Sequence, residues 1–244
     1  MAPAIEIENF SYRYADGTDA VRGISLSIGH GERVAFIGPN GAGKSTLLLG
    51  MLGFVKGSGR VLIDGIEVRR ENTKKIRTLT GSVLQDPDEQ LFMPTLFDDV
   101  AFGPLNMGLE EAEIRRRVEH ALATVGLEGK GHRPPHHLSA GQKRAAAIAT
   151  VLSMSPKIIT MDEPDSSLDP RSRKRLVELL RTLTQTLVIA SCNMEFVAQL
   201  CERVILIDGG KIVADGKAKA ILSDAALMEE HGLEIVRGCF DPRG

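Results

Sequence analysis

Apolar and polar residues alternate along several short stretches of the chain, and this pattern predicts strands with one buried face. The alternation runs over residues 5–8 and 24–28, and a shorter apolar stretch at 61–63 precedes an Asp-Gly turn. Period-two alternation bounded by turn residues is typical of antiparallel sheets with one solvated face. These stretches therefore predict a small antiparallel sheet packed on a larger core.

Continuous apolar runs predict a second set of strands that are buried on both faces. Such runs occupy residues 34–37, 157–161 and 187–190. They are of strand length and end at turn residues or polar residues. A further pair, 204–207 and 212–214, flanks an Asp-Gly-Gly-Lys turn and predicts a hairpin.

Helical patterns lie between these runs. Apolar residues recur at helical spacing within 110–125, and Ser139 stands where an N-cap is expected for a helix that ends at residue 152. Asp169 before Pro170 marks another helix start, because aspartate caps helix N-termini and proline suits the first helical position. Residues 217–244 predict a helix followed by a tail.

The composition is that of an ordinary globular protein. The 244 residues are 43% hydrophobic and 25% charged, and the net charge is −2, which gives no basic field for a nucleic-acid backbone. No apolar stretch approaches the ~20 residues of a membrane-spanning helix, and the first residues lack a signal-peptide pattern. Cys192, Cys201 and Cys239 have no zinc-like spacing. We therefore expect a cytosolic protein without a nucleic-acid partner, so that any membrane belongs to a partner.

One segment carries a specific chemical signal. Residues 38–46 match the phosphate-binding pattern G-x-x-x-x-G-K-[ST], between the apolar run 34–37 and a helix-like run at 47–52. Glycines let backbone N–H groups surround a polyphosphate at the positive end of the helix, whereas the same glycines in another context would only form a turn with a solvated lysine. The candidate nucleotide-binding residues are Gly38, Pro39, Asn40, Gly41, Ala42, Gly43, Lys44, Ser45 and Thr46.

The remaining motifs resemble those of ATP-binding cassette (ABC) ATPases, in the order and at about the spacing of that family. They cover nearly all of residues 4–235. The Leu-Ser-Ala-Gly-Gln stretch at 138–142 resembles the LSGGQ signature, with alanine at its third position. The matching residues are Tyr14 as an adenine-stacking aromatic, Gln85 of the Q-loop, Ser139, Ala140, Gly141 and Gln142 of the signature, Asp162 and Glu163 of Walker B, and Ser167, Leu168 and Asp169 of the D-loop.

This resemblance implies an α/β fold with three parts. A P-loop NTPase core, mostly a parallel sheet flanked by helices, should carry an antiparallel β subdomain and a helical signature subdomain. One ABC ATPase domain is expected over 4–235, with the Q-loop and the helical subdomain at about 86–155, and a tail at 236–244.

A narrower resemblance points to the ATPase component of energy-coupling-factor importers, the group that contains the cobalt and nickel importer ATPases. It is carried by residues 85–92, 99–104, 207–216 and the His-Gly-Leu-Glu stretch at 231–234. It implies peripheral attachment to the cytoplasmic side of the membrane and a second ATPase subunit, either an identical copy or a paralogue. Residues 86–107, rich in bulky apolar types and proline, are the expected docking site for the membrane component, although such residues also build ordinary cores.

The family's chemistry assigns roles to these residues, with ATP and Mg²⁺ as cofactors. Lys44 would hold the phosphates; Ser45, Gln85 and Asp162 would ligate Mg²⁺; Glu163 would act as the general base. The signature of one subunit would cover the γ-phosphate held by the other. Two of these assignments have simpler alternatives: Asp162-Glu163 could be a strand-end turn before Pro164, and Tyr14 could be a packing residue on an edge strand, with Tyr12 on the opposite face.

The chain departs from the family at the switch histidine. After the run 187–190 the sequence reads Ser-Cys-Asn-Met, which puts Cys192 at this position. A neutral thiol is a weak hydrogen-bond donor and cannot match an imidazole as a phosphate contact. We therefore expect ATP binding with slowed turnover; the alternatives are unimpaired hydrolysis through compensating geometry, a non-hydrolysing ATP-gated subunit, and a cassette ATPase outside transport.

Overall fold

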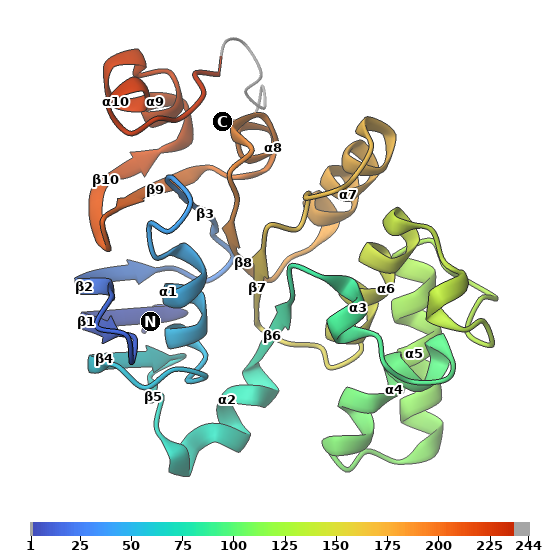
Figure 1. The fold of residues 1–244 in the computed structure, drawn as a ribbon. Helices are drawn as coiled ribbons and strands as arrows, with labels where there is room; N and C mark the ends of the chain where they lie inside the picture. The colour runs from blue at the N-terminus through green and yellow to red at the C-terminus, as the bar shows by residue number, and fades with distance from the viewer. Residues whose placement is uncertain (1, 237–244) are drawn as a thin grey trace.

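The computed structural model describes residues 2–236, and within this range the strands form two sheets (Figure 1). The smaller sheet is antiparallel with the order β2-β1-β4-β5. Its strands are β1 (Ile5–Arg13), β2 (Asp19–Ile28), β4 (Ser58–Ile63) and β5 (Ile66–Glu67). The antiparallel β subdomain predicted from the alternating stretches is therefore present.

The larger sheet has the order β10-β9-β3-β8-β7-β6. The strands from β9 to β6 run parallel to one another, whereas β10 pairs with β9 as an antiparallel hairpin. Their bounds are β3 (Arg33–Ile37), β6 (Thr80–Val83), β7 (Ile158–Asp162), β8 (Thr186–Ala190), β9 (Arg203–Asp208) and β10 (Lys211–Lys217). Because β3, β7 and β8 are neighbours and parallel, the loops that follow them meet at one edge of the sheet.

Helices cover this sheet and build a separate group beside it, on the right of Figure 1. The group consists of α3 (Pro87–Gln90), α4 (Leu96–Asn106), α5 (Glu111–Thr124) and α6 (Ala140–Leu152). The other helices are α1 (Lys44–Met51), α2 (Thr73–Leu79), α7 (Pro170–Thr182), α8 (Met194–Leu200), α9 (Ala218–Leu222) and α10 (Ala225–Glu230), with 3-10 turns η1 (Arg70–Asn72) and η2 (Pro135–His137).

Three clusters of buried apolar residues correspond to these parts. One lies between the large sheet and helices α6 to α10, a second lies between the two sheets and α1, and a third fills the helical group. Helix α6 joins two of them, because Ala147 and Val151 belong to the first cluster while Ala146 and Ala149 belong to the third. The signature helix is thus fixed to the sheet on one side and to the helical group on the other.

The α/β fold with its antiparallel and helical subdomains is confirmed. The predicted caps are also present: the Ser139 and Asp169 side chains accept backbone N–H bonds at the starts of α6 and α7. Of the expected tail at 236–244, Val236 is buried and donates its N–H to Leu222, while 237–244 lie outside the described residues. Within 2–236, no helix is long and apolar enough to cross a lipid bilayer.

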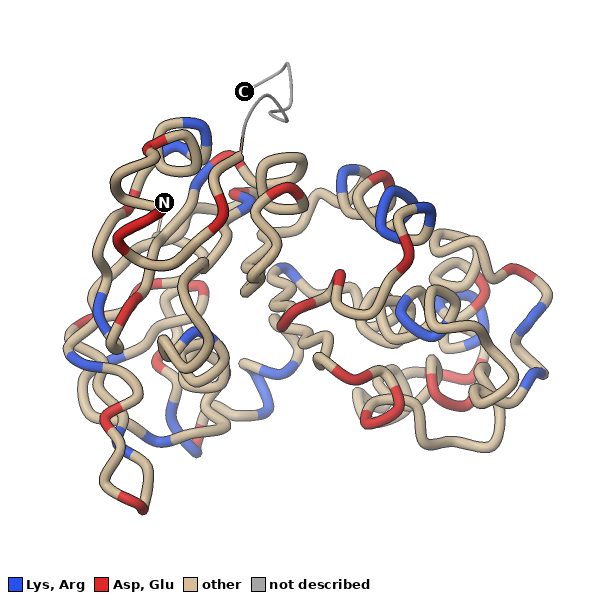
Figure 2. Tube along the Cα trace, turned by 45° about the horizontal axis from the view of Figure 1, so that its top comes forward, with Lys and Arg blue, Asp and Glu red and all other residues tan. Residues whose placement is uncertain are grey.

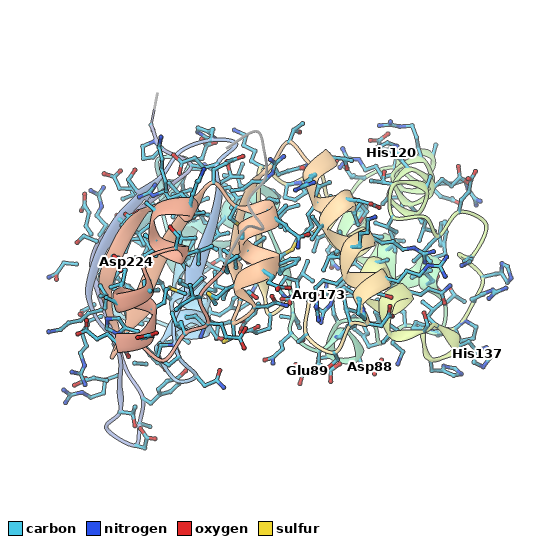
Figure 3. The ribbon with its side chains drawn as sticks, turned by 90° about the horizontal axis from the view of Figure 1, so that it is seen from above. Asp88, Glu89, His120, His137, Arg173 and Asp224 are labelled. Carbon is cyan, nitrogen blue, oxygen red and sulfur yellow. The ribbon has the colours of Figure 1, made fainter. Side chains whose placement is uncertain are left out.

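Charged residues of both signs are interspersed along most of the trace, and a run of basic residues lies on α7 (Figure 2). Seen from above, α7 lies beside the helical group, with Arg173 in its first turn (Figure 3).

Candidate functional site

The loop between β3 and α1 has the shape of an anion cradle. Gly38, Gly41 and Gly43 have φ angles of 147°, 80° and 103°, conformations that other residues rarely adopt. A Cβ atom on Gly38 would lie 1.9 Å from the Ile207 carbonyl oxygen, and one on Gly43 would lie 2.2 Å from that of Ala20. The loop is therefore held against the backbone of β9 and β2, which fixes its path.

Lys44 begins α1 and is 6% exposed. Its Nζ donates to the carbonyl oxygens of Gly38 at 2.8 Å and Pro39 at 3.0 Å, and lies 3.4 Å from the Cys192 Sγ. The ammonium group is thus held inside the loop, at the N-terminus of a helix. Its charge and the helix dipole together favour an anion here.

Most of the predicted nucleotide-binding residues line one cleft of about 490 Å³. Gly38 and Pro39 do not line the cleft. Their carbonyl oxygens accept hydrogen bonds from Lys44, which does. The lining residues are Tyr14, Thr18, Ala20, Asn40, Gly41, Ala42, Gly43, Lys44, Ser45, Thr46, Gln85, Glu163, Ser166 and Cys192.

Tyr14 lies at this cleft and is 41% exposed. Its hydroxyl hydrogen-bonds with Thr46 Oγ1 at 2.8 Å, and its ring contacts Tyr12 edge-on at 5.0 Å. Two details of the sequence interpretation were wrong. Tyr12 lies on the same side as Tyr14, since the two rings are in contact. Tyr14 also does not stand on an edge strand, because it follows β1 (Ile5–Arg13), which is internal to its sheet.

Asp162 and Glu163 stand at the end of β7. Asp162 Oδ1 is buried and has no hydrogen-bond partner among the described residues. A carboxylate oxygen without a hydrogen-bond partner is available as a ligand, and Mg²⁺ prefers oxygen ligands, so the residues present fit this ion. Ser45 and Gln85 line the neighbouring cleft and carry neutral oxygen atoms that could complete such a site.

The Glu163 side chain is held in place by the loop after β8. Its Oε2 accepts the backbone N–H of Cys192 at 3.1 Å. Glu163 also has φ of 43°, an uncommon conformation for a residue with a side chain and one that is found at functional sites. The carboxylate is therefore oriented by the backbone of the neighbouring loop.

Cys192 contacts both sides of the cleft. Its Sγ lies 3.4 Å from Asn40 Oδ1 as well as 3.4 Å from Lys44. Burial and the neighbouring Glu163 raise the pKa of the thiol, and this effect exceeds the lowering by Lys44. The thiol is thus neutral near pH 7 and acts as a weak donor. Asn193 points away, because its side chain caps α8.

The signature residues do not line this cleft. Ser139 caps α6 in a capping box with Gln142, and both line a separate cavity of about 670 Å³ between α5, α6 and α7, together with Gly141. Ala140 lines a third cavity beside Gln85 and the D-loop. The cleft and the signature are therefore apart within one chain.

In the D-loop, Ser167 has a positive φ of 60° and Leu168 is buried. Asp169 accepts N–H bonds from Arg171 and Ser172 at the start of α7. The segment is thus fixed by its own backbone and by the helix that follows.

Sequence reasoning missed a buried arginine that joins the signature helix to the Q-loop. Arg144 is 3% exposed and donates to the carbonyl oxygens of Leu84 and Gln85, each at 2.7 Å. Gln90 reinforces this junction, because it accepts from the Leu84 N–H and donates to Ala147 on α6. The position of Arg144, two residues after the signature, was the available signal, but nothing in its spacing indicated burial.

The segment 86–107 divides into core and surface. Leu96, Val100 and Pro104 are buried, whereas Phe92, Phe102 and Leu105 are 62%, 44% and 57% exposed. The rings of Phe92 and Phe102 pack edge-on at 5.2 Å. We call Phe92, Phe102 and Leu105 the apolar patch. Part of the segment is therefore ordinary core, whereas docking of a membrane component at the apolar patch stays a prediction.

Comparison with known proteins agrees with the motifs. The ABC transporter family profile matches residues 21–166. A putative ABC transporter ATP-binding protein of Streptomyces coelicolor is 46% identical over 99% of this chain and 94% of its own length. The energy-coupling factor transporter ATP-binding protein EcfA of Methanothermobacter thermautotrophicus is 44% identical over 96% of this chain and 77% of its own length.

Solved structures give the same result. CbiO1 of Clostridium perfringens, described as part of the ABC transporter complex CbiONQ, superposes with a TM-score of 0.83 at 39% identity over 94% of each chain. A dimeric ATP-binding cassette bound to ADP and Pi superposes with a TM-score of 0.79 at 28% identity, over 88% of this chain and 98% of its own. The chain therefore belongs to the ABC transporter family, as one of its ATP-binding subunits.

Proposed function

We propose that this chain is the ATPase subunit of an energy-coupling-factor importer for a metal ion such as cobalt or nickel, or for a vitamin. It binds and hydrolyses MgATP and drives uptake through a membrane partner. The observation that carries the catalytic part is the convergence of Lys44, Glu163 and Cys192 on one cleft. The relatives named EcfA and the CbiO1 structure support the importer class.

Within the cleft each residue has a separate task. Lys44 binds the β- and γ-phosphates, and the N-terminus of α1 adds its dipole. Ser45, Gln85 and Asp162 would hold Mg²⁺, which would neutralise charge on the phosphates. Glu163 orients a water and accepts its proton as the water attacks the γ-phosphorus, while the bond from this phosphorus to the bridging oxygen breaks and ADP leaves. Tyr14 presents its exposed ring to the adenine.

A second ATPase subunit, either a copy of this chain or a paralogue, completes the site. The support is that Ser139 and Ala140 are exposed and lie outside the cleft of their own chain. In the pair, the Ser139 hydroxyl and the start of α6 would face the γ-phosphate held by the partner. ATP then joins the two subunits, and its hydrolysis releases them.

The apolar patch on α4 and the preceding loop is the proposed contact with the membrane component. Exposed aromatic and aliphatic groups gathered at one place are typical of interaction sites. This attachment would hold the chain on the cytoplasmic side of the membrane as a peripheral subunit. Recognition of the transported ion or vitamin then belongs to another protein of the complex.

Cys192 favours a slower variant of this function. The backbone N–H of Cys192 still orients Glu163, but its neutral thiol offers little to a γ-phosphate. A slow or non-hydrolysing ATP-gated subunit is therefore the second candidate. Cys192→His should raise the steady-state ATPase rate of the assembled complex, whereas Cys192→Ser, which keeps a small hydroxyl, should change it little. An unchanged rate in Cys192→His would refute the slowing.

Transport coupling can be tested by purification from detergent-solubilised membranes. The tagged chain should be recovered with an integral membrane protein, and Phe92→Ser/Phe102→Ser should reduce that recovery. Val213→Ser is the matched control, because Val213 is 42% exposed on β10, and β10 and α4 lie on opposite sides of the molecule in Figure 1. Recovery that is independent of the patch, or recovery with nucleic acid or ribosomes instead, would contradict the proposal.

A further inference from the structure

A buried polar network lies behind the proposed general base, and the mechanism above does not use it. Its centre is Asp165, which is 3% exposed in the loop between β7 and α7. Asp165 Oδ1 accepts the hydroxyl of Ser191 at 2.9 Å, and Ser191 is 0% exposed. Burying a carboxylate costs free energy unless it is hydrogen-bonded or paired with a cation, so the burial of Asp165 must be offset by its contacts.

The network reaches the base through one loop. Ser191 Oγ also accepts the backbone N–H of Asn193 at 3.1 Å, so both neighbours of Cys192 are tied to Asp165 through one hydroxyl. The Cys192 N–H between them donates to Glu163 Oε2. The bond to Ser191 thereby fixes the direction in which the Cys192 N–H points.

The same carboxylate also reaches the D-loop. Asp165 Oδ2 lies 3.8 Å from Arg173 Nε, and the Nη2 of Arg173 donates to the Leu168 carbonyl at 3.3 Å. Arg173 stands in the first turn of α7, where Figure 3 labels it. Asp165 therefore lies between the D-loop and the loop that carries Cys192.

We propose that Asp165 is a positioning residue that holds Glu163 in its reactive orientation, through Ser191 and the Cys192 backbone, and joins this orientation to the D-loop. The proposal rests on the proposed function in that Glu163 acts as the general base. A movement of the D-loop would shift Arg173 and Asp165 together and would change the bond to Glu163. The D-loop is thus connected to Glu163 in two ways, through the backbone between them and through the hydrogen bonds of this network.

Two single variants and their combination test this link. Asp165→Ala and Ser191→Ala should each lower kcat about 10- to 100-fold, the loss expected when a reacting group is misplaced, with the Kd for MgATP unchanged. The double variant should lose no more than either single variant, because both remove one connection. Asp165→Asn keeps an acceptor for Ser191 and should lose less than Asp165→Ala.

A second readout does not depend on turnover. Each alanine variant should raise the rate at which iodoacetamide modifies Cys192, measured by peptide mass mapping without nucleotide, by about threefold or more, because the loop opens more easily. Ser153→Ala is the matched control, since Ser153 is a buried hydroxyl bonded to Val100 and Thr150 away from the cleft. It should cost stability without changing either readout.

The outcomes separate the two proposals. If the wild type does not hydrolyse ATP, the proposed function fails, and the alkylation rates alone decide the network. If Asp165→Ala does not fold, Ser191→Ala and Asp165→Asn carry the test. The inference is overturned if Ser191→Ala behaves like Ser153→Ala, with wild-type kcat and wild-type modification of Cys192.

Discussion

The phosphate-binding loop offers a matched pair of glycines. Gly41 and Gly43 both have positive φ, at 80° and 103°, but only Gly43 is packed against another strand. A Cβ on Gly43 would lie 2.2 Å from the Ala20 carbonyl oxygen, whereas a Cβ on Gly41 would meet nothing within 4 Å. Alanine at the two positions therefore separates backbone strain from steric conflict.

The expected losses of stability follow from the backbone strain and the steric conflict. An L-residue in this region costs roughly 1–2 kcal/mol, which is the whole expected cost of Gly41→Ala. Gly43→Ala adds a forced displacement of packed backbone, which is worth about 1–3 kcal/mol more. For a chain of this size, each kcal/mol lost from the free energy of unfolding lowers the melting temperature by about 2–4 °C. Gly43→Ala should thus lower the melting temperature about twice as far as Gly41→Ala.

The assay is thermal unfolding without nucleotide, followed by circular dichroism because the chain has no tryptophan. MgATP titration of the same samples then shows whether the displaced loop still binds. Equal melting temperatures for the two variants would refute the reasoning, since they would mean that Ala20 does not confine Gly43.

Three further predictions concern residues outside the loop. Arg144→Ala should destabilise the chain by about 3 kcal/mol in urea unfolding, because two carbonyls lose a charged donor, whereas the exposed Arg116→Ala should stay near the wild type. Burial raises the pKa of Asp99, so the contribution of this group to stability is present at low pH and is lost as the pH rises. Asparagine at this position does not titrate. In urea unfolding, the stability of Asp99→Asn relative to the wild type should therefore increase from about pH 4 towards pH 7. His231→Ala breaks the 2.7 Å contact of Nδ1 with Asp208 and should lower the melting temperature, whereas His120→Ala, on the exposed face of α5, should not.

The sequence was sufficient for the elements and motifs that depend on local pattern. Alternation, apolar runs and capping residues such as Ser139 and Asp169 act over a few positions, and the structure has strands and helices where they predict them. The phosphate-binding loop is local as well, since its pattern is eight consecutive residues, 38–45.

The contacts that sequence reasoning missed join residues far apart in the chain. Arg144 reaches carbonyls about 60 positions away, and Asp165 meets Ser191 at a separation of 26. The residues next to Arg144 and Asp165 in the sequence are like those next to an exposed polar residue on a helix or loop. Their burial is decided by how α6 and β8 pack, which one sequence does not show.

The proposed function depends on Glu163 supporting hydrolysis of MgATP in the cleft beside Lys44. The decisive measurement is single-turnover hydrolysis by Glu163→Gln, compared with the wild type at saturating MgATP. Glu163→Gln should bind MgATP with the wild-type Kd and hydrolyse it about 100-fold or more slowly, as loss of a general base requires. Hydrolysis by Glu163→Gln at the wild-type rate would show that Glu163 is not the base.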